Sequence, residues 1–246
     1  MSGQEKTMAL TEHLRELRKR LIISVIAVAL GFFAAYYYSD RLYWVIASPL
    51  VESLPQGQDF LVFTGIVEPF FIYLKVGLLG GIILASPVVL YELWAFIAPA
   101  LYREERRWFV FTVFFSLILF TGGTLFAFEV VFPFGFKYLL SYSAPGLKPF
   151  LSMSEYFSMA TRLLLAFGLI FQLPLIMLVL SKLGVVSARQ LASWWRYALV
   201  AIVIASAILT PTPDVFNQLL MAGPLIVLYG IGVGAAALFG KKKETE

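Results

Sequence analysis

The sequence predicts an all-α membrane protein with six transmembrane helices, and three observations predict this fold class. Of the 246 residues, 60% are hydrophobic and only 14% are charged. The apolar residues gather in six long stretches, and the basic residues gather in alternate connections between them. An ordinary soluble domain carries about 25% charged residues. This chain therefore lacks the charge to cover a surface in water, and a soluble enzyme is excluded.

The apolar stretches are the candidate membrane spans: residues 21–38, 72–97, 108–128, 157–180, 197–209 and 219–239. A helix rises 1.5 Å per residue, so about 20 residues cross a hydrocarbon core about 30 Å thick. The fifth stretch reaches only about 20 Å. We expect the fifth and sixth helices to be short and to form a hairpin beside which the bilayer thins or water enters. The alternative is a re-entrant fifth segment closed by Pro211 and Pro213.

The distribution of Lys and Arg predicts the orientation of the spans. Fourteen Lys and Arg lie in the segment before the first span, in the 98–107 and 181–196 connections, and after the last span. Three lie in the other connections. Because basic residues stay on the cytoplasmic side of short loops, both chain ends are predicted to face the cytoplasm.

The remaining segments predict one domain over residues 1–246, with residues 1–7 disordered. The two long connections predicted outside the cytoplasm, 39–71 and 129–156, are rich in proline. We expect them to form structured caps with short helices. The first span is longer than the apolar core of a signal peptide and five more spans follow it, so it is predicted to stay in the protein.

Several chemistries are excluded by composition. The chain has no cysteine and a single histidine, His13, so no Cys- or His-rich metal site is expected. It has no Gly-rich phosphate loop, no basic stripe typical of nucleic-acid binding, and no catalytic set for hydrolysis. The sequence predicts neither an enzyme nor a cofactor.

Two charged segments at the predicted cytoplasmic face have two interpretations each. In the first, Leu14, Leu17 and Leu21 share one helix face, and Glu16 lies four residues before Arg20. It is either a basic collar with an internal ion pair or part of a binding site. In the second, Glu105 lies among three arginines. Glu105 either lies in a solvated loop whose charges neutralise one another, or its carboxylate accepts two hydrogen bonds from an arginine of a ligand. Lysine cannot donate in this bidentate geometry.

Few polar side chains lie inside the spans. Lys75, Glu92 and Arg162 lie close enough to helix ends to extend toward water. Gln172 is deeper and precedes Pro174, which breaks the helical hydrogen bonding. The amide of Gln172 either satisfies that backbone or lines a polar cavity.

Two further features concern packing and capping. The residues suited to close helix packing are Gly77, Gly80, Gly81 and the pair Gly230 and Gly234. Asp214 is suited to cap the sixth helix.

An ordered set of motifs then identifies a family. These are HLRELRKR at 13–20, SPL at 48–50, SPVVLYELWAFIAPALY at 86–102, FP at 132–133, FG at 167–168 and LTPTPDVF at 209–216. Together they resemble TatC, the receptor family of the twin-arginine protein translocase, over residues 10–240.

The resemblance implies a receptor in the cytoplasmic membrane that binds Arg-Arg signal peptides of folded cargo proteins and assembles with TatA and TatB. It also implies contact with membrane lipids and association between copies of the chain. It implies that Glu105 is the main acceptor of the arginine pair. The other residues of this signal-peptide-binding site are then Glu16, Arg18, Phe96 and Arg103. By the same resemblance, Thr210 and Gln218 contact TatA and TatB, while Pro49 and Asp214 are extracytoplasmic positions that matter for function.

One position departs from the family pattern. The family usually has Glu where this chain has Gln172, a polar position of its concave face, and a neutral amide cannot ionise there. The alternative function is a secondary transporter for a small solute, with Gln172, Arg162 and Glu92 along its path. The absence of internal repeats and the shortage of midplane charges count against it.

Overall fold

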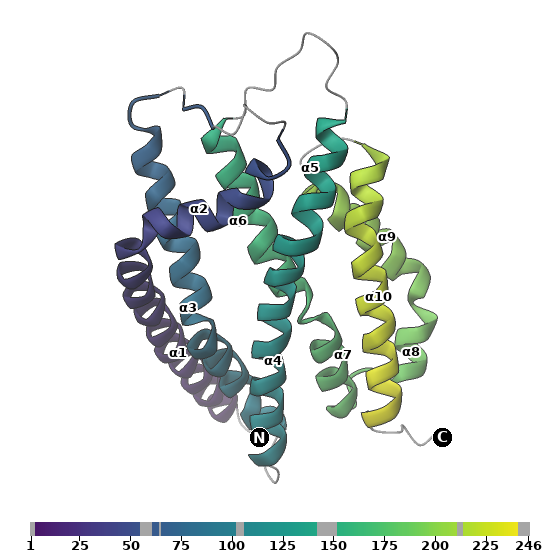
Figure 1. Cartoon of the computed structure of the whole chain (residues 1–246). Helices are drawn as coiled ribbons and strands as arrows, with labels where there is room; N and C mark the ends of the chain where they lie inside the picture. Colours follow the sequence, from purple (N-terminus) through teal and green to yellow (C-terminus); the bar gives the residue numbers. More distant parts are fainter. Residues whose placement is uncertain are drawn as a thin grey trace.

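The protein is a bundle of helices, as the sequence predicts (Figure 1). The computed structural model describes residues 3–54, 61–63, 65–101, 106–141, 152–210 and 214–240, and of residues 3–11, 98–101 and 106–107 it describes the backbone alone. Five helical runs in this part are long and apolar enough to cross a membrane, and a shorter apolar helix, α9 (Trp195–Leu209), accompanies them. Within the described residues, the one β-type contact is an isolated parallel bridge between Val62 and Ser152.

The membrane-crossing runs alternate in direction through the bundle, and some runs contain more than one element (Figure 1). In chain order the elements besides α9 are α1 (Gly3–Tyr37), α2 (Ser39–Val51), α3 (Glu68–Leu101), α4 (Arg106–Phe126), η1 (Ala127–Val131), α5 (Phe132–Leu140), α6 (Met153–Ile170), α7 (Leu173–Lys182), α8 (Ala188–Ser193) and α10 (Val215–Phe239). The start of α1, the facing ends of α3 and α4, the α7–α8 connection and the end of α10 all lie at the lower end in Figure 1. The segments predicted to share one side of a membrane therefore share one end of the molecule, which we call the basic end.

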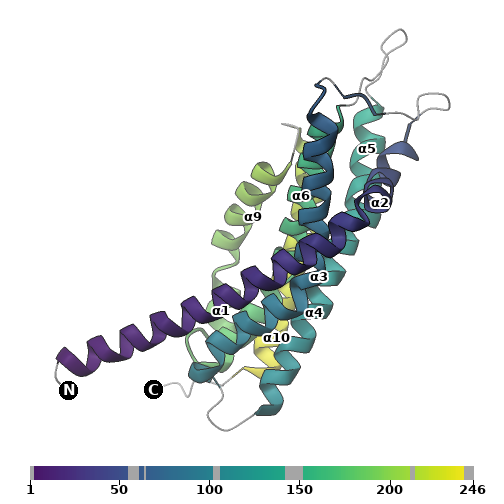
Figure 2. The same cartoon turned by 90° about the vertical axis from the view of Figure 1, so that its left-hand side faces the viewer.

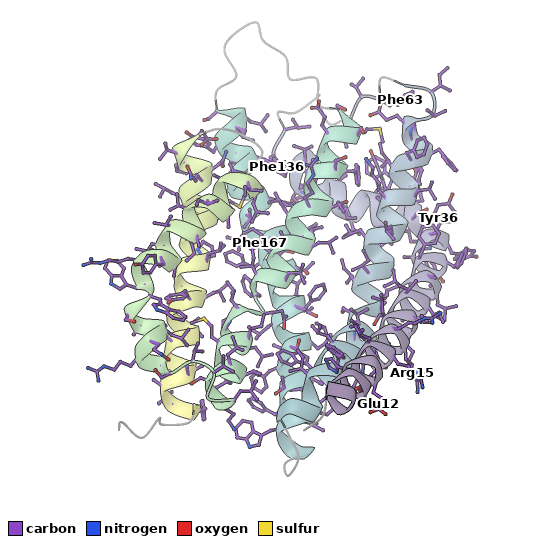
Figure 3. The ribbon with its side chains drawn as sticks, turned by 180° about the vertical axis from the view of Figure 1, so that it is seen from behind. Glu12, Arg15, Tyr36, Phe63, Phe136 and Phe167 are labelled. Atoms are coloured by element: carbon purple, nitrogen blue, oxygen red, sulfur yellow. The ribbon has the colours of Figure 1, made fainter. Side chains whose placement is uncertain are left out.

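Helix α1 lies along α3 and makes few contacts with the rest of the bundle (Figures 1 and 2). In Figure 3, Glu12 and Arg15 lie near its start and Tyr36 near its far end. Much of its apolar surface is exposed, as expected where lipid is the solvent. It begins at Gly3.

The α1–α3 contact depends on glycines. A Cβ added to Gly31 would lie 2.6 Å from the carbonyl oxygen of Gly81, so the two backbones touch. Gly77 and Gly80 also face α1, as predicted. The predicted close contact through Gly230 and Gly234 is wrong.

In α10, an added Cβ at Gly230 or Gly234 would meet nothing within 4 Å, whereas Gly232 packs directly against Met177 of α7. The expectation of a short sixth helix is also wrong, because α10 has 25 residues. Only α9, with 15 residues, is short.

Helix α2 confirms a short helix in the 39–71 connection, and Pro49 lies inside it. Proline cannot donate to the carbonyl of Val45 four residues earlier, and the Ser48 hydroxyl donates to that oxygen instead, at 2.9 Å. Tyr43 of α2 stacks on Phe157 of α6, with ring centroids 4.8 Å apart. Burial raises the pKa of the Tyr43 phenol above its usual value, so the ring stays neutral at physiological pH.

The third span continues beyond its predicted end at Phe128. A single π-helical turn, η1, joins α4 to α5, and the helical run reaches Leu140. Pro133 lies in the first turn of α5, where a missing N–H is tolerated, and the N–H of Phe132 donates to the carbonyl of Ala127. Proline therefore shifts the hydrogen-bond pattern here without ending the helix.

Pro174 has the stronger effect that the sequence predicts. Helix α6 ends at Ile170 and α7 begins at Leu173, so the fourth span is broken at Phe171 and Gln172. The main core lies in the half of the bundle away from the basic end. Phe136 and Phe167, labelled in Figure 3, belong to it.

The backbone contact between α1 and α3 predicts a sharp difference between glycines. A Cβ at Gly81 would lie 2.5 Å from the backbone nitrogen of Phe32, so Gly81→Ala forces the helices apart. We expect it to lower the free energy of unfolding by about 1–3 kcal/mol. Gly234→Ala is the matched control and costs nothing. Thermal unfolding in one detergent measures both variants, and equal midpoints would contradict this packing.

Candidate functional site

A guanidinium group joins α1 to α3 toward the basic end. Arg20 donates from Nε and Nη2 to one oxygen of Glu16, at 3.0 and 2.7 Å. Its Nη1 donates to Glu92 of α3 at 2.9 Å. The predicted ion pair between Glu16 and Arg20 is therefore confirmed. The second carboxylate comes from another helix, which the sequence spacing did not reveal.

The prediction that Glu92 extends toward water is wrong. Its side chain is only 11% exposed, whereas those of Arg20 and Glu16 are 24% and 34% exposed. A carboxylate in a membrane-spanning helix is costly without a cation beside it. Arg20 supplies that cation, and its other nitrogens reach the more exposed Glu16.

The predicted signal-peptide residues that can be placed lie near this ion cluster. Phe96 stacks on His13 of α1, with ring centroids 4.4 Å apart and an interplanar angle of 20°. Arg18 is exposed, and within the described residues it forms no ion pair. Glu16, Arg18 and Phe96 are thus carried by the same two helices. Arg103 and Glu105 lie outside the described residues, in the short segment between α3 and α4.

Gln172 occupies neither of the two environments considered for it. Its oxygen accepts a hydrogen bond from the Ser116 hydroxyl at 2.7 Å, and its amide nitrogen donates to the Ser116 carbonyl at 3.0 Å. The side chain is 5% exposed, so it does not present a polar group on a concave face. It joins α4 to the break between α6 and α7.

Two more polar contacts join helices at the opposite end. Lys75 donates to the Ser158 hydroxyl of α6 at 2.8 Å and does not depend on water alone. Glu68 accepts from the backbone N–H of Gly65 and from that of Ser154, at 3.2 and 3.0 Å. It therefore joins the starts of α3 and α6. This contact between the starts of α3 and α6 could not be predicted from the sequence, because the two helices are far apart in the chain.

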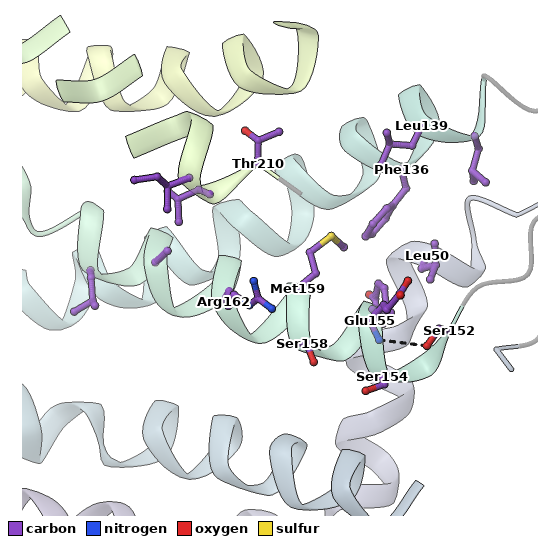
Figure 4. Close-up of a pocket in the computed structure, with 16 residues that line it drawn as sticks. Leu50, Phe136, Leu139, Ser152, Ser154, Glu155, Ser158, Met159, Arg162 and Thr210 are labelled. Atoms are coloured by element: carbon purple, nitrogen blue, oxygen red, sulfur yellow. Dashed lines mark hydrogen bonds between the residues drawn. The ribbon is translucent and has the colours of Figure 1, made fainter. Parts of the chain in front are cut away.

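Three predicted site residues lie in the α9–α10 connection or in the first turn of α10. Asp214 caps α10, as predicted, and accepts from the backbone N–H of Asn217 at 2.8 Å. Gln218 donates to the carbonyl of Val203 in α9 at 3.2 Å. Thr210 follows α9 directly and lines a cavity of about 1040 Å³ together with α6 and α5 (Figure 4). Pro49 lies elsewhere, inside α2.

Within the described part of the chain, no group of three acidic or histidine side chains could hold a metal ion. The polar residues form structural contacts between helices and one ion cluster.

The unequal exposure of the three charges predicts an unequal response to mutation. Arg20→Leu leaves the buried Glu92 carboxylate without a cation, which should cost about 3 kcal/mol or more. Glu92→Leu should cost less, because Arg20 keeps Glu16 and some contact with water. The double variant Arg20→Leu/Glu92→Leu should be more stable than Arg20→Leu alone. Thermal unfolding in one detergent ranks the three, and a milder effect of Arg20→Leu than of Glu92→Leu would contradict the pairing.

Comparison with known proteins gives one result throughout. The family described as Sec-independent protein translocase protein (TatC) matches residues 12–224. Proteins of that name are similar along their length. The one from Desulforapulum autotrophicum is 43% identical over all of this chain and 90% of its own, and the one from Aquifex aeolicus 42% identical over 96% and 98%. The Escherichia coli K12 protein is 38% identical over 98% and 93%.

A solved structure has the same fold. The crystal structure of a twin-arginine translocase receptor, TatC, is 41% identical and aligns with a TM-score of 0.81 over 91% of this chain and 97% of the solved one. With the apolar helices and the motifs, these likenesses show that the chain belongs to the TatC family, the multi-pass, non-enzymatic membrane core component of the Tat protein translocase.

Proposed function

We propose that this chain captures Arg-Arg signal peptides of folded proteins at its basic end, with Glu105 as the main acceptor of the arginine pair. Glu16, Arg18, Phe96 and Arg103 complete the site. The observation that carries the proposal is the Arg20 cluster, in which two carboxylates from α1 and α3 already hold a guanidinium group. Family membership favours this function over transport of a small solute.

The physical chemistry of the pair explains the preference for arginine. An exposed ion pair contributes only about 0–1 kcal/mol, so one glutamate cannot select a cargo. Two guanidinium groups can each form a pair of hydrogen bonds with a carboxylate. Two lysines carry the same charge but cannot form these bidentate hydrogen bonds. The apolar segment of the signal peptide gains further binding energy against the exposed apolar surface of α1.

The proposed orientation places the basic end in the cytoplasm and the protein in the cytoplasmic membrane, with six crossings and both chain ends inside. The segregation of Lys and Arg supports it. TatA and TatB are the proposed partners at Thr210 and Gln218, beside the short helix α9, and TatA assembly would use the proton-motive force for transport. Pro49 and Asp214 act through α2 and through the cap of α10.

Replacing one carboxylate tests the assignment. Glu105→Ala should reduce the affinity for an Arg-Arg signal peptide by tenfold or more, since it removes a charged bidentate acceptor worth about 1.5–3 kcal/mol. Glu129→Ala is the matched control, because Glu129 is an exposed glutamate of η1 on another part of the bundle. Binding of a labelled peptide to the purified protein measures both. Unchanged affinity in Glu105→Ala, with a normal unfolding midpoint, would refute the role of Glu105.

A further inference from the structure

The cavity beside α9 contains a cation, Arg162, that has no partner among the described residues. Arg162 of α6 lines it, and within the described residues no hydrogen bond or ion pair engages its guanidinium group. Helix α6 begins at Met153, so Arg162 lies nine residues along it, about 14 Å from its start. An arginine at that depth in a bilayer is costly unless it reaches water or an anion. Water or an anionic group must therefore reach this exposed arginine.

The short helix α9 brings the membrane surface toward Arg162. Trp194, Trp195 and Tyr197 are exposed at its start, which is typical of an interface anchor. Its 15 residues span about 22 Å, about 8 Å less than the usual hydrocarbon core. Thr210, directly after α9, lines the same cavity as Arg162 (Figure 4). The bilayer beside α9 must thin to match the helix, and lipid headgroups then come within reach of a long side chain on α6.

The polar side chains that α6 contributes to the cavity wall lie toward its start. Ser154, Glu155 and Ser158 line the outer part beside Tyr156 and Met159, Arg162 follows, and Ala166 and Leu169 line the inner part. Figure 4 shows Ser154, Ser158 and Arg162 in this order along the helix. Ile208 and Leu209 of α9 extend the apolar part. A wall with this gradient fits an amphiphile, with its polar head outward and its acyl chain inward.

We propose that this cavity binds a membrane phospholipid whose phosphate pairs with Arg162. The second charge of the cavity narrows the choice of headgroup. Glu155 lies seven residues before Arg162, about 10 Å nearer the start of α6, and it forms no ion pair within the described residues. The charges thus run from negative outside to positive inside. A zwitterionic lipid with an outer ammonium and an inner phosphate, such as phosphatidylethanolamine, matches this order.

Lipid retention by the purified full-length chain tests the site, independently of any signal peptide. Native mass spectrometry of the protein titrated with phosphatidylethanolamine should show affinity about tenfold or more weaker in Arg162→Gln, with Arg162→Lys in between. Glu155→Gln should lower the affinity for phosphatidylethanolamine and leave that for phosphatidylglycerol unchanged or higher. Arg41→Gln, an exposed arginine of α2 outside the cavity, is the matched control.

Lipid retention and crosslinking can each overturn the proposal. Equal retention by Arg162→Gln and the unaltered protein would overturn the proposal, and so would displacement of the lipid by inorganic phosphate alone. A photocrosslinking residue at position 159, in the cavity wall, should capture phospholipid in membranes. Capture of a second protein or a second copy of the chain in place of lipid would also overturn it.

Discussion

The fold depends on pairing buried charged side chains inside a bundle whose solvent is lipid. Arg20 shows this constraint most directly, because it is held by Glu16 of its own helix and by the buried Glu92 of α3. Helix α1 packs along α3 and contacts little else in the bundle, and the two backbones touch at Gly31 and Gly81. The ion cluster and the glycine contact therefore fix where α1 lies, and with it the side chains that α1 presents at the basic end.

The sequence could predict the fold far better than the contacts between helices. Hydropathy located the spans, because it depends on one-dimensional composition. The cap at Asp214 was predictable because it is local. The partner of Glu92 was not, since the rotation of a helix about its axis does not follow from its own sequence. The same limit explains why Gly232 makes the close contact in place of Gly230 and Gly234. At Pro133 a π turn absorbs the missing N–H, which composition alone does not reveal.

The two ends of the bundle differ in chemistry. At the basic end, carboxylates of α1 and α3 hold a guanidinium group of the chain itself, and the proposed ligand carries the same group. Near the other end, a guanidinium group of α6 that has no ion pair in the described part of the chain lines a cavity with polar and apolar side chains. Gln172 lies between them as a buried bridge to Ser116. A neutral amide suits that position, because its oxygen accepts from the hydroxyl while its nitrogen donates to the carbonyl.

In the proposed function, carboxylates at the basic end recognise paired arginines. The most direct measurement places a photocrosslinking residue at position 16 or 105 of the full-length chain in membranes and presents a signal peptide with Arg-Arg or Lys-Lys. We expect both positions to crosslink to the Arg-Arg peptide and only weakly to the Lys-Lys peptide. Equal crosslinking to both peptides, or capture by one position without the other, would contradict it.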